Sequence, residues 1–417
     1  MDKHIKIISI IIFITSINIF SQSSSIYSRL GIGDMVYSYS ARSLGMGQLG
    51  NADAVPDFVN TLNPATWSRI DKTRFEIGVD YTGLSESDNS NNGFYGRAEF
   101  RGFTLAFPIS SQYGIGMSMG LMPYSRVSYN VTYNYPSPTD NVSNYQISYL
   151  GSGGLTKTYI GTSFQFPFGL ALGATMDYYF GDLSYSSQVN FSNSSDVSTN
   201  YLKTYRPNGL GTTVGLITPD IAPLFNSKFV EDIRLGFSAS YISDLSTDTI
   251  ATSNNVIALD TLGTGTVMMK IPLRVSGGIS FVLNKKYLVT LDYLDQPWQN
   301  YSFDNVKSSY LRNAYKVSAG FEYRPLHDIG STFWQNVIWR GGLSYEQTQY
   351  NINNTGIYQY SVSGGFSLPL SFENTLDVGL QYSTRGTTAN SLVKENSFRF
   401  DVGLSLGELW FVSGERY

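Results

Sequence analysis

Two serines in the chain lie in the G-x-S-x-G pattern of a nucleophile elbow, Ser118 in GMSMG and Ser405 in GLSLG. A nucleophilic serine needs a base to take its proton, and the chain contains only two histidines. His4 lies close to the N-terminus, and His327 lies in a predicted connection between strands. We therefore expect no hydrolase chemistry, and we interpret these glycines and serines as small residues that face a lumen.

The other motifs that could carry chemistry lack the context they need. GMGQLG, at Gly45, Gly47 and Gly50, fits a dinucleotide-binding fingerprint, but no strand precedes it, so we interpret it as a packed turn. Without cysteine, and with one histidine beyond the leader, no metal cluster of the usual kind is expected. We expect several acids to form ion pairs across a lumen instead of binding calcium: Asp177, Asp292, Glu322, Asp377 and Asp401, with Arg234, Lys316 and Arg399 as partners. The sequence therefore predicts no catalytic residue, cofactor or metal.

Composition limits the class of protein. Charged residues are 14% of the 417, against about 25% in an average soluble domain, while aromatic residues reach 15%. The mean hydropathy is -0.12, and beyond the N-terminus no run of about 20 apolar residues could form a membrane-spanning helix. The net charge of -4 gives no sign of nucleic-acid binding. A large secreted β protein or a transmembrane β-barrel remains.

The first residues resemble a secretory signal peptide. Lys3 and Lys6 precede the apolar run IISIIIFI at residues 7–14, and small residues follow at 21–25. We predict cleavage after Ser21. A membrane anchor that stays attached is the alternative, but the run is short and polar residues interrupt it.

Alternation of apolar and polar residues recurs along the rest of the chain. In FRFDVGLSL, Phe398, Phe400 and Leu404 share one face of a strand, while Asp401 and Ser405 share the other. The polar face is rich in glycine and serine. A soluble sandwich would normally carry Lys, Glu and Thr on its polar faces, whereas small residues fit the crowded interior of a closed barrel. The pattern therefore favours a transmembrane antiparallel β-barrel.

About fourteen segments of this kind can be counted, an even number as expected for a bacterial single-chain barrel. The predicted strands are 73–85, 94–108, 113–133, 144–167, 169–192, 199–218, 231–243, 267–283, 286–297, 314–324, 336–346, 356–371, 374–386 and 396–412. Connections after strands two, four, eight and twelve are short, whereas most others are long and polar, including residues 244–265. This asymmetry predicts short periplasmic turns and long outer loops.

Two positions interrupt the pattern. Glu99 and Arg101 share parity with Phe103, so either they lie above the bilayer or a bulge shifts the register; we expect the former. Pro123 breaks the third predicted strand, and proline removes a ladder hydrogen bond. It predicts either a gap that opens from the lumen to the bilayer or a bend above the membrane.

The chain resembles the FadL-like outer-membrane transporters. The resemblance rests on the signal peptide, the segment ARSLGMGQLGNADAVPDFVNTLNPATWSRI, about fourteen strands, the proline-broken third strand and GSGGL before Thr156. Its most specific part is the NPA of Asn63, Pro64 and Ala65. The resemblance implies that residues 22–71 form a hatch inside a barrel of residues 72–417. It also implies that hydrophobic small molecules enter from outside and leave sideways into outer-membrane lipid near Pro123.

The residues of the NPA turn agree with a hatch. A fourteen-stranded barrel is wide enough to leak unless it is filled. Pro64 fixes a turn, Asn63 can bond its own backbone there, and Trp67 supplies bulk for the lumen. The same turn could instead join a periplasmic tail to the first strand, although a tail has little need of Trp67 and Phe58.

Departures from the FadL-like pattern leave a second function open. The family more usually has an acidic run and Tyr-Asn before the NPA, whereas this chain has NADAVPDFVNTLNPA. Several predicted lumenal positions are also charged. The PorV-like barrels of type IX secretion use a similar scaffold to hold secreted proteins, and the ending GELWFVSGERY weakly resembles barrels of that lineage. The alternative to a channel is therefore a scaffold for a secreted or periplasmic protein, and neither function is enzymatic.

Overall fold

The computed structural model describes residues 25–110, 112–136, 144–192, 198–225, 228–255, 259–325, 332–371 and 373–409. The predicted signal peptide, residues 1–21, lies outside them, as do His4, His327 and most of the C-terminal GELWFVSGERY. No helix within these ranges is long and apolar enough to cross a membrane.

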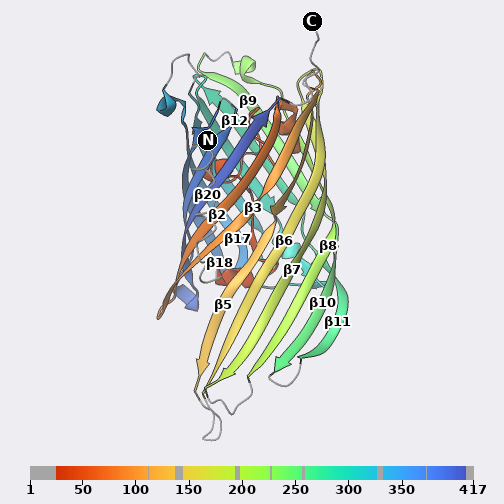
Figure 1. Ribbon diagram of the computed structural model, residues 1–417, viewed down its shortest axis with the longest axis vertical. Helices are drawn as coiled ribbons and strands as arrows, with labels where there is room; N and C mark the ends of the chain where they lie inside the picture. Colours follow the sequence, from red (N-terminus) through yellow and green to blue (C-terminus); the bar gives the residue numbers. More distant parts are fainter. Residues whose placement is uncertain are drawn as a thin grey trace, which may run out of the picture.

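Fourteen antiparallel strands form a closed barrel, as predicted (Figure 1). Three of them are broken into two labelled halves. The strands are β2 (Thr73–Ser87), β3 (Asn92–Ser110), β4 (Ile115–Pro123) with β5 (Ser125–Tyr135), β6 (Tyr145–Gln165), β7 (Ala171–Phe191), β8 (Thr199–Ile217), β9 (Val230–Ile242) with β10 (Leu245–Asn255), β11 (Leu259–Lys270) with β12 (Arg274–Leu283), β13 (Tyr287–Gln296), β16 (Ala314–Tyr323), β17 (Ile338–Ile352), β18 (Thr355–Pro369), β19 (Thr375–Gly386) and β20 (Lys394–Glu408). Pairing of β20 with β2 closes the ring.

Shorter elements lie inside the barrel or at its ends. They are η1 (Ile26–Arg29), β1 (Asp34–Met35), α2 (Ala41–Gly45), η2 (Pro64–Arg69), η3 (Ala222–Phe225), η4 (Trp298–Asn300), β14 (Ser302–Phe303), β15 (Val306–Lys307), η5 (Phe333–Asn336) and η6 (Ala389–Ser391). We call the end where β2 begins and β20 ends the base, which is uppermost in Figure 1, and the opposite end the rim.

The two faces of the wall are those that the alternation predicts. On β20, Phe398 is 49% and Phe400 37% exposed, whereas Asp401 and Ser405 are buried. Ser118 is also buried, and its hydroxyl lies 3.0 Å from the Tyr159 hydroxyl. Glycine and serine therefore line the lumen while apolar side chains point outward.

The expectation for Glu99 and Arg101 is wrong, because a bulge shifts the register. Between Gly78 and Val79 of β2 the pairing with β3 skips Arg101, and Gly102 has a φ of +120°, which glycine adopts readily. Arg101 consequently turns into the lumen, where it is 1% exposed.

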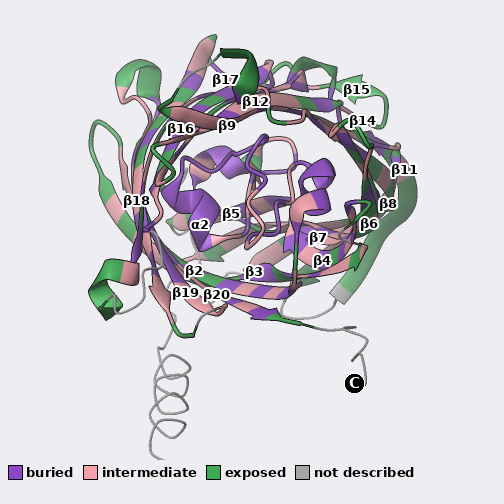
Figure 2. Cartoon of the chain, turned by 90° about the horizontal axis from the view of Figure 1, so that it is seen from above, coloured by how far each residue is buried: buried purple, intermediate pink, exposed green. Residues whose placement is uncertain are grey.

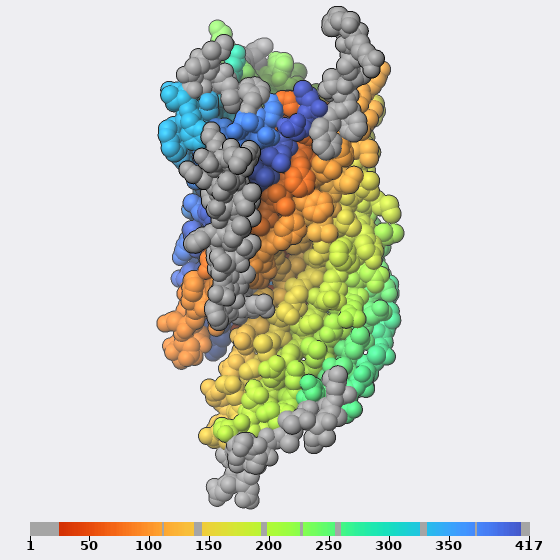
Figure 3. Space-filling model, in the orientation of Figure 1, coloured from red at the N-terminus to blue at the C-terminus, as the bar shows by residue number. Residues whose placement is uncertain are grey.

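Residues 244–265, predicted as a long loop, are mostly strand. The segments β10 and β11 pair with each other across this stretch, and β10 also pairs with β8. The wall is therefore uneven. Strands β6 and β7 have 21 residues each, whereas β13 and β16 have 10, so one side of the barrel extends further at the rim (Figures 1 and 3).

Residues 25–71 run through the inside of the barrel, and we call them the inner segment (Figure 2). At the rim, Ser25 donates to Glu395 at the start of β20 and the Ile26 amide donates to Glu86 at the end of β2. The segment ends at the base, immediately before β2. It therefore runs through the lumen from rim to base.

Candidate functional site

The NPA turn forms the start of η2 and is attached to the wall. Asn63 caps η2: its Oδ1 accepts from the Ala65 amide at 3.1 Å, and Pro64 occupies the first turn, as predicted. The Asn63 side-chain amide donates to the Asn51 carbonyl at 2.8 Å and to the Leu216 carbonyl of β8 at 3.0 Å. One asparagine therefore fixes both the turn and its place against the barrel.

Two glycines of the wall make room for this turn. A Cβ atom on Gly173 of β7 would lie 2.4 Å from the Pro64 carbonyl carbon, and one on Gly215 of β8 would lie 2.0 Å from Asn63 Oδ1. Next to it, Trp67 is 1% exposed and stacks on Tyr159, with ring centroids 5.8 Å apart. Sequence reasoning identified the turn but could not identify the glycines, because their role depends on what faces them across the lumen.

Replacing Gly215 by alanine is expected to displace the turn. The new methyl group would overlap Asn63, so we expect a loss of about 1–3 kcal/mol in the free energy of unfolding and faster proteolysis of the inner segment. The matched control is Gly341→Ala on β17, where nothing lies within 4 Å of the added Cβ. Equal melting temperatures and equal proteolysis of the two variants would show that Gly215 is not needed to make room for the NPA turn.

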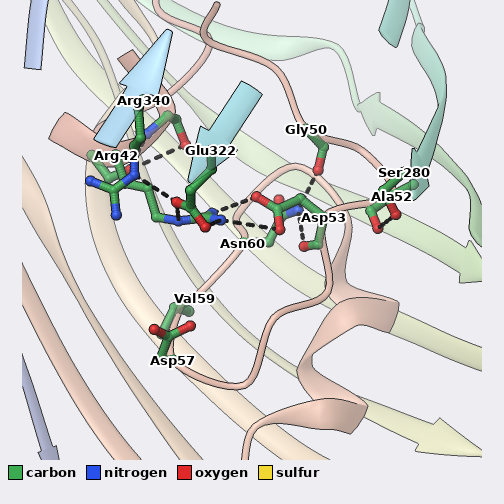
Figure 4. A network of polar contacts seen from close by, with 12 residues as sticks. Arg42, Gly50, Ala52, Asp53, Asp57, Val59, Asn60, Ser280, Glu322 and Arg340 are labelled. Carbon is green, nitrogen blue, oxygen red and sulfur yellow. Dashed lines mark hydrogen bonds and ion pairs between the residues drawn. The ribbon is translucent and has the colours of Figure 1, made fainter. Parts of the chain in front are cut away.

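A buried network of charges ties the inner segment to the wall (Figure 4). Arg42 of α2 donates from Nε to Glu322 of β16 at 3.0 Å and also contacts Asp53. Arg340 of β17 donates to the same Glu322 at 2.6 Å. Burial alone would lower the pKa of Arg42, but Asp53 and Glu322 raise it well above its usual value, so this guanidinium stays charged.

The network extends from Glu322 in two directions. Arg324 lies 2.6 Å from Glu322 and 2.9 Å from Asp57 of the inner segment. Arg340 lies 3.3 Å from Asp377 of β19. Glu322 is 0% and Arg42 4% exposed, so their ion pair is shielded from water, whereas the Arg324 and Asp57 side chains are 27% and 34% exposed. The sequence indicated paired acids in the lumen but not that Arg42 and Asp53 would join them.

The other predicted lumenal acids also have partners. Asp177 lies 3.4 Å from Lys157, Asp401 accepts from Arg399 at 2.8 Å, and Asp292 accepts from the Asn51 amide at 2.6 Å. Asp177 and Asp401 are therefore paired as predicted, but with residues of the adjacent strand and of the same strand and not across the lumen. Two expected cations pair elsewhere, Arg234 with Asp232 and Lys316 with Glu346. No group of three or more metal-ligating side chains occurs among the residues that the structure describes.

The wall is interrupted where β4 ends at Pro123. The ladder between β3 and β4 ends at Phe103 opposite Leu121, and rimward of this point β3 pairs with β2 alone. β5 pairs with β6, and no pairing joins β3 to β5 within residues 92–110 and 115–135. Pro123 therefore lies where the strand is interrupted between β4 and β5, next to a gap in the ladder.

The inner segment occupies part of this gap. Its β1 pairs antiparallel with the start of β5, Asp34 opposite Arg126 and Met35 opposite Ser125. Asp34 is held in turn by Arg385 at 2.7 Å and by the Tyr350 hydroxyl at 2.8 Å. Since β1 takes the edge of β5 that β3 would otherwise use, the inner segment and the gap form a single site.

The lumen beside this site is nearly filled. A cavity of about 30 Å³ lies next to Pro123, and one of about 150 Å³ is lined by charged groups that include Asp80, Arg126 and Arg399. Both are smaller than the roughly 300–1,000 Å³ of typical ligand pockets.

Solved structures share this fold. The CymD monoaromatic hydrocarbon channel is 16% identical, with a TM-score of 0.59, over 91% of this chain and 100% of that chain. The toluene transporter TbuX of Ralstonia pickettii is 17% identical, with a TM-score of 0.58, over 89% and 99%. A Pseudomonas aeruginosa FadL homologue is 14% identical, with a TM-score of 0.59, over 89% and 99%. The predicted FadL-like fold is confirmed.

Family membership follows from the sequence comparison. No curated protein matches the chain. The model of the BamG family matches residues 1–415. Because that match covers almost the whole chain, the protein belongs to the BamG family.

Proposed function

We propose that this protein is an outer-membrane channel for passive uptake of hydrophobic or amphipathic small molecules. The inner segment, within residues 22–71, acts as the hatch, and the gap beside Pro123 is the lateral exit. The apolar outward face of the barrel supports a place in the bilayer. The names of the related structures, a monoaromatic hydrocarbon channel and a toluene transporter, support the class of cargo.

The observation that carries this proposal is that the two-residue β1 pairs with the start of β5, at the edge where no ladder joins β5 to β3 within the described residues. We infer that this arrangement closes the path sideways from the lumen. Movement of β1 away from β5 would leave the backbone edges of both wall strands open to the bilayer. No bond of the cargo is made or broken, so the channel needs neither a catalytic residue nor a cofactor.

Replacing Pro123 by valine tests the lateral exit. Valine restores a backbone N–H at the point where β3 separates from β4. The ladder between these two strands can then extend and narrow the gap between β3 and β5. We expect uptake of radiolabelled toluene by whole cells to fall several-fold, with an unchanged melting temperature. Pro369→Val, at the end of β18 in an intact ladder, is the control. Wild-type uptake in the Pro123→Val variant would contradict a lateral exit at this gap.

A scaffold for a secreted or periplasmic protein is the second candidate. The filled, charged lumen favours it, because protein binding does not need an open path. Mass spectrometry of the protein purified gently from its native outer membrane separates the two functions. A near-stoichiometric hydrophobic compound would support the channel, whereas a reproducible protein partner with bulk lipid alone would support the scaffold.

A further inference from the structure

Six strand segments reach beyond the rest of the wall at the rim (Figures 1 and 3). We call them the extension: residues 127–135 of β5, 145–153 of β6, 183–191 of β7, 199–205 of β8, 247–255 of β10 and 259–267 of β11. They form one continuous antiparallel sheet in that order. The extension therefore has two outer edges, β5 and β11.

The polarity of the two faces reverses where the extension begins. Closer to the base, outward side chains of β6 and β7 are apolar, as with Ile160, Phe164 and Met176, which are 47%, 40% and 60% exposed. In the extension the same outward parity carries mostly polar residues: Gln146, Ser148, Ser152, Ser184, Ser186, Gln188, Asn190, Asn200 and Thr204. Such a face suits water and not lipid, so the extension projects from the bilayer.

On β5 to β8 the inward face of the extension is mostly aromatic. By parity it carries Tyr129, Val131, Tyr133, Tyr135, Tyr145, Ile147, Tyr149, Tyr185, Ser187, Val189, Phe191, Tyr201, Lys203 and Tyr205, and on β10 it continues with Thr249, Ala251 and Ser253. Near the barrel these rings pack together, for example Tyr185 against Tyr205 at 5.8 Å. Further out, Tyr133 is 47%, Tyr149 40% and Tyr201 41% exposed. Tyrosine rings exposed to water on a concave sheet are typical of surfaces that bind a partner.

The β5 edge of the extension has unpaired backbone groups. Ser28 Oγ accepts from the Ser128 amide and donates to the Ser128 carbonyl, both at 3.0 Å, so this residue directs its backbone away from β6. Because that direction alternates along an antiparallel strand, Asn130, Thr132 and Asn134 also direct their backbone groups away from β6. In the described part of the chain, nothing pairs with the backbone of these three residues on that side.

This edge also lacks the usual protection of an edge strand. Residues 127–135 read VSYNVTYNY and contain no charge, proline or glycine. Edge strands are normally blunted by charged residues, proline or bulges, because a bare edge is a template for another strand. The opposite edge, β11, carries Gly263 and Gly265, which weaken it as a template. The β5 edge is thus the better of the two for strand addition.

The structure already contains a strand added to this edge. Asp34 and Met35 of the inner segment pair as a strand with Arg126 and Ser125, and the Ser28 hydroxyl of η1 satisfies the backbone of Ser128, so this edge accepts an extended strand at Ser125 and Arg126 and a side chain at Ser128. β3 does not take the remaining positions, because its described residues pair with β2 and β4 alone. What continues the pairing must come from outside the described chain.

We propose that residues 130–134 of β5 bind an extended segment of a partner polypeptide by β-strand addition at the outer surface. Backbone hydrogen bonds to Asn130, Thr132 and Asn134 supply affinity, and apolar side chains at alternate positions of the partner contact Tyr133, Tyr135 and Tyr149. The proposal does not depend on the channel, and it gives the scaffold function a defined place.

Photo-crosslinking in native outer membranes tests the proposal. A photoreactive phenylalanine analogue replaces Tyr133, and the adduct is identified by peptide mass spectrometry. We expect one polypeptide, crosslinked through an extended segment, and about a tenfold lower yield when Thr132→Pro removes the edge donor. The control is Thr264→Pro on the β11 edge. The carbonyl of Met268, four residues further along β11, faces away from β10 and accepts from the Asp304 amide, so by alternation Thr264 also directs its backbone away from β10.

Each other result overturns the proposal. An adduct of twice the chain mass would make the occupant a second copy, and an adduct with lipid alone would make the tyrosines a membrane contact. A polypeptide adduct with equal yield in both proline variants would show that the β5 edge is not used. If Thr132→Pro fails to fold, Thr132→Lys places a blocking charge on the same edge. Toluene uptake in these variants is measured in parallel, because its loss would report on the channel and not on this surface.

Discussion

Oxidation of a Met35→Cys/Ser125→Cys variant is expected to reduce toluene uptake to about a tenth or less of its reduced level. These residues are Cα partners in the pairing of β1 with β5, which suits the short Cα separation of a disulfide. The wild-type chain has no cysteine, so no other disulfide can form. If β1 must leave β5 to open the lateral exit, a covalent link between them keeps the exit closed, and a reductant restores uptake.

The matched control is a disulfide that joins two strands of the wall. Ser383 and Ser397 are Cα partners on β19 and β20, with hydroxyls 2.6 Å apart on the lumenal side. A Ser383→Cys/Ser397→Cys pair should form as readily and leave uptake unchanged in either redox state. Equal uptake by oxidised and reduced Met35/Ser125 protein would mean that β1 does not gate passage.

Removal of the Arg42 side chain is expected to have the largest effect on the packing of the inner segment. Arg42→Ala leaves Glu322 with Arg324 and Arg340, but Asp53 keeps a buried carboxylate without its ion-pair partner. Breaking a buried pair in this way typically costs about 3–5 kcal/mol. Amide hydrogens of residues 40–60 should then exchange faster, and cells should become more sensitive to large polar antibiotics.

Two further variants make this prediction specific. Asp53→Asn added to Arg42→Ala removes the stranded charge and should restore part of the protection from exchange. Arg206→Ala breaks a pair with Asp182 whose side chains are 56% and 64% exposed, so it should leave exchange and antibiotic sensitivity unchanged. If the Arg42 and Arg206 variants behave alike, the network does not hold the inner segment in place.

Errors in the strand prediction have local physical causes. The bulge at Gly102 depends on how β3 pairs with β2, which alternation within one strand does not record. Residues 244–265 looked like a loop because a strand that leaves the bilayer carries polar residues on its outward face, and Ser, Thr and Asn are also common in loops.

The sequence by itself determined the barrel, its fourteen strands and the NPA turn. Apolar and polar residues alternate in the strands because the barrel wall separates apolar surroundings from a polar lumen. The NPA turn follows from local hydrogen bonding by Asn63 and from the fixed φ of Pro64. Only the tertiary structure decided what meets inside: Gly215 beneath Asn63, Arg42 against Glu322, and β1 on the edge of β5. These contacts join residues far apart in the chain, and their partners depend on strand register and on the path of the inner segment, which no local pattern encodes.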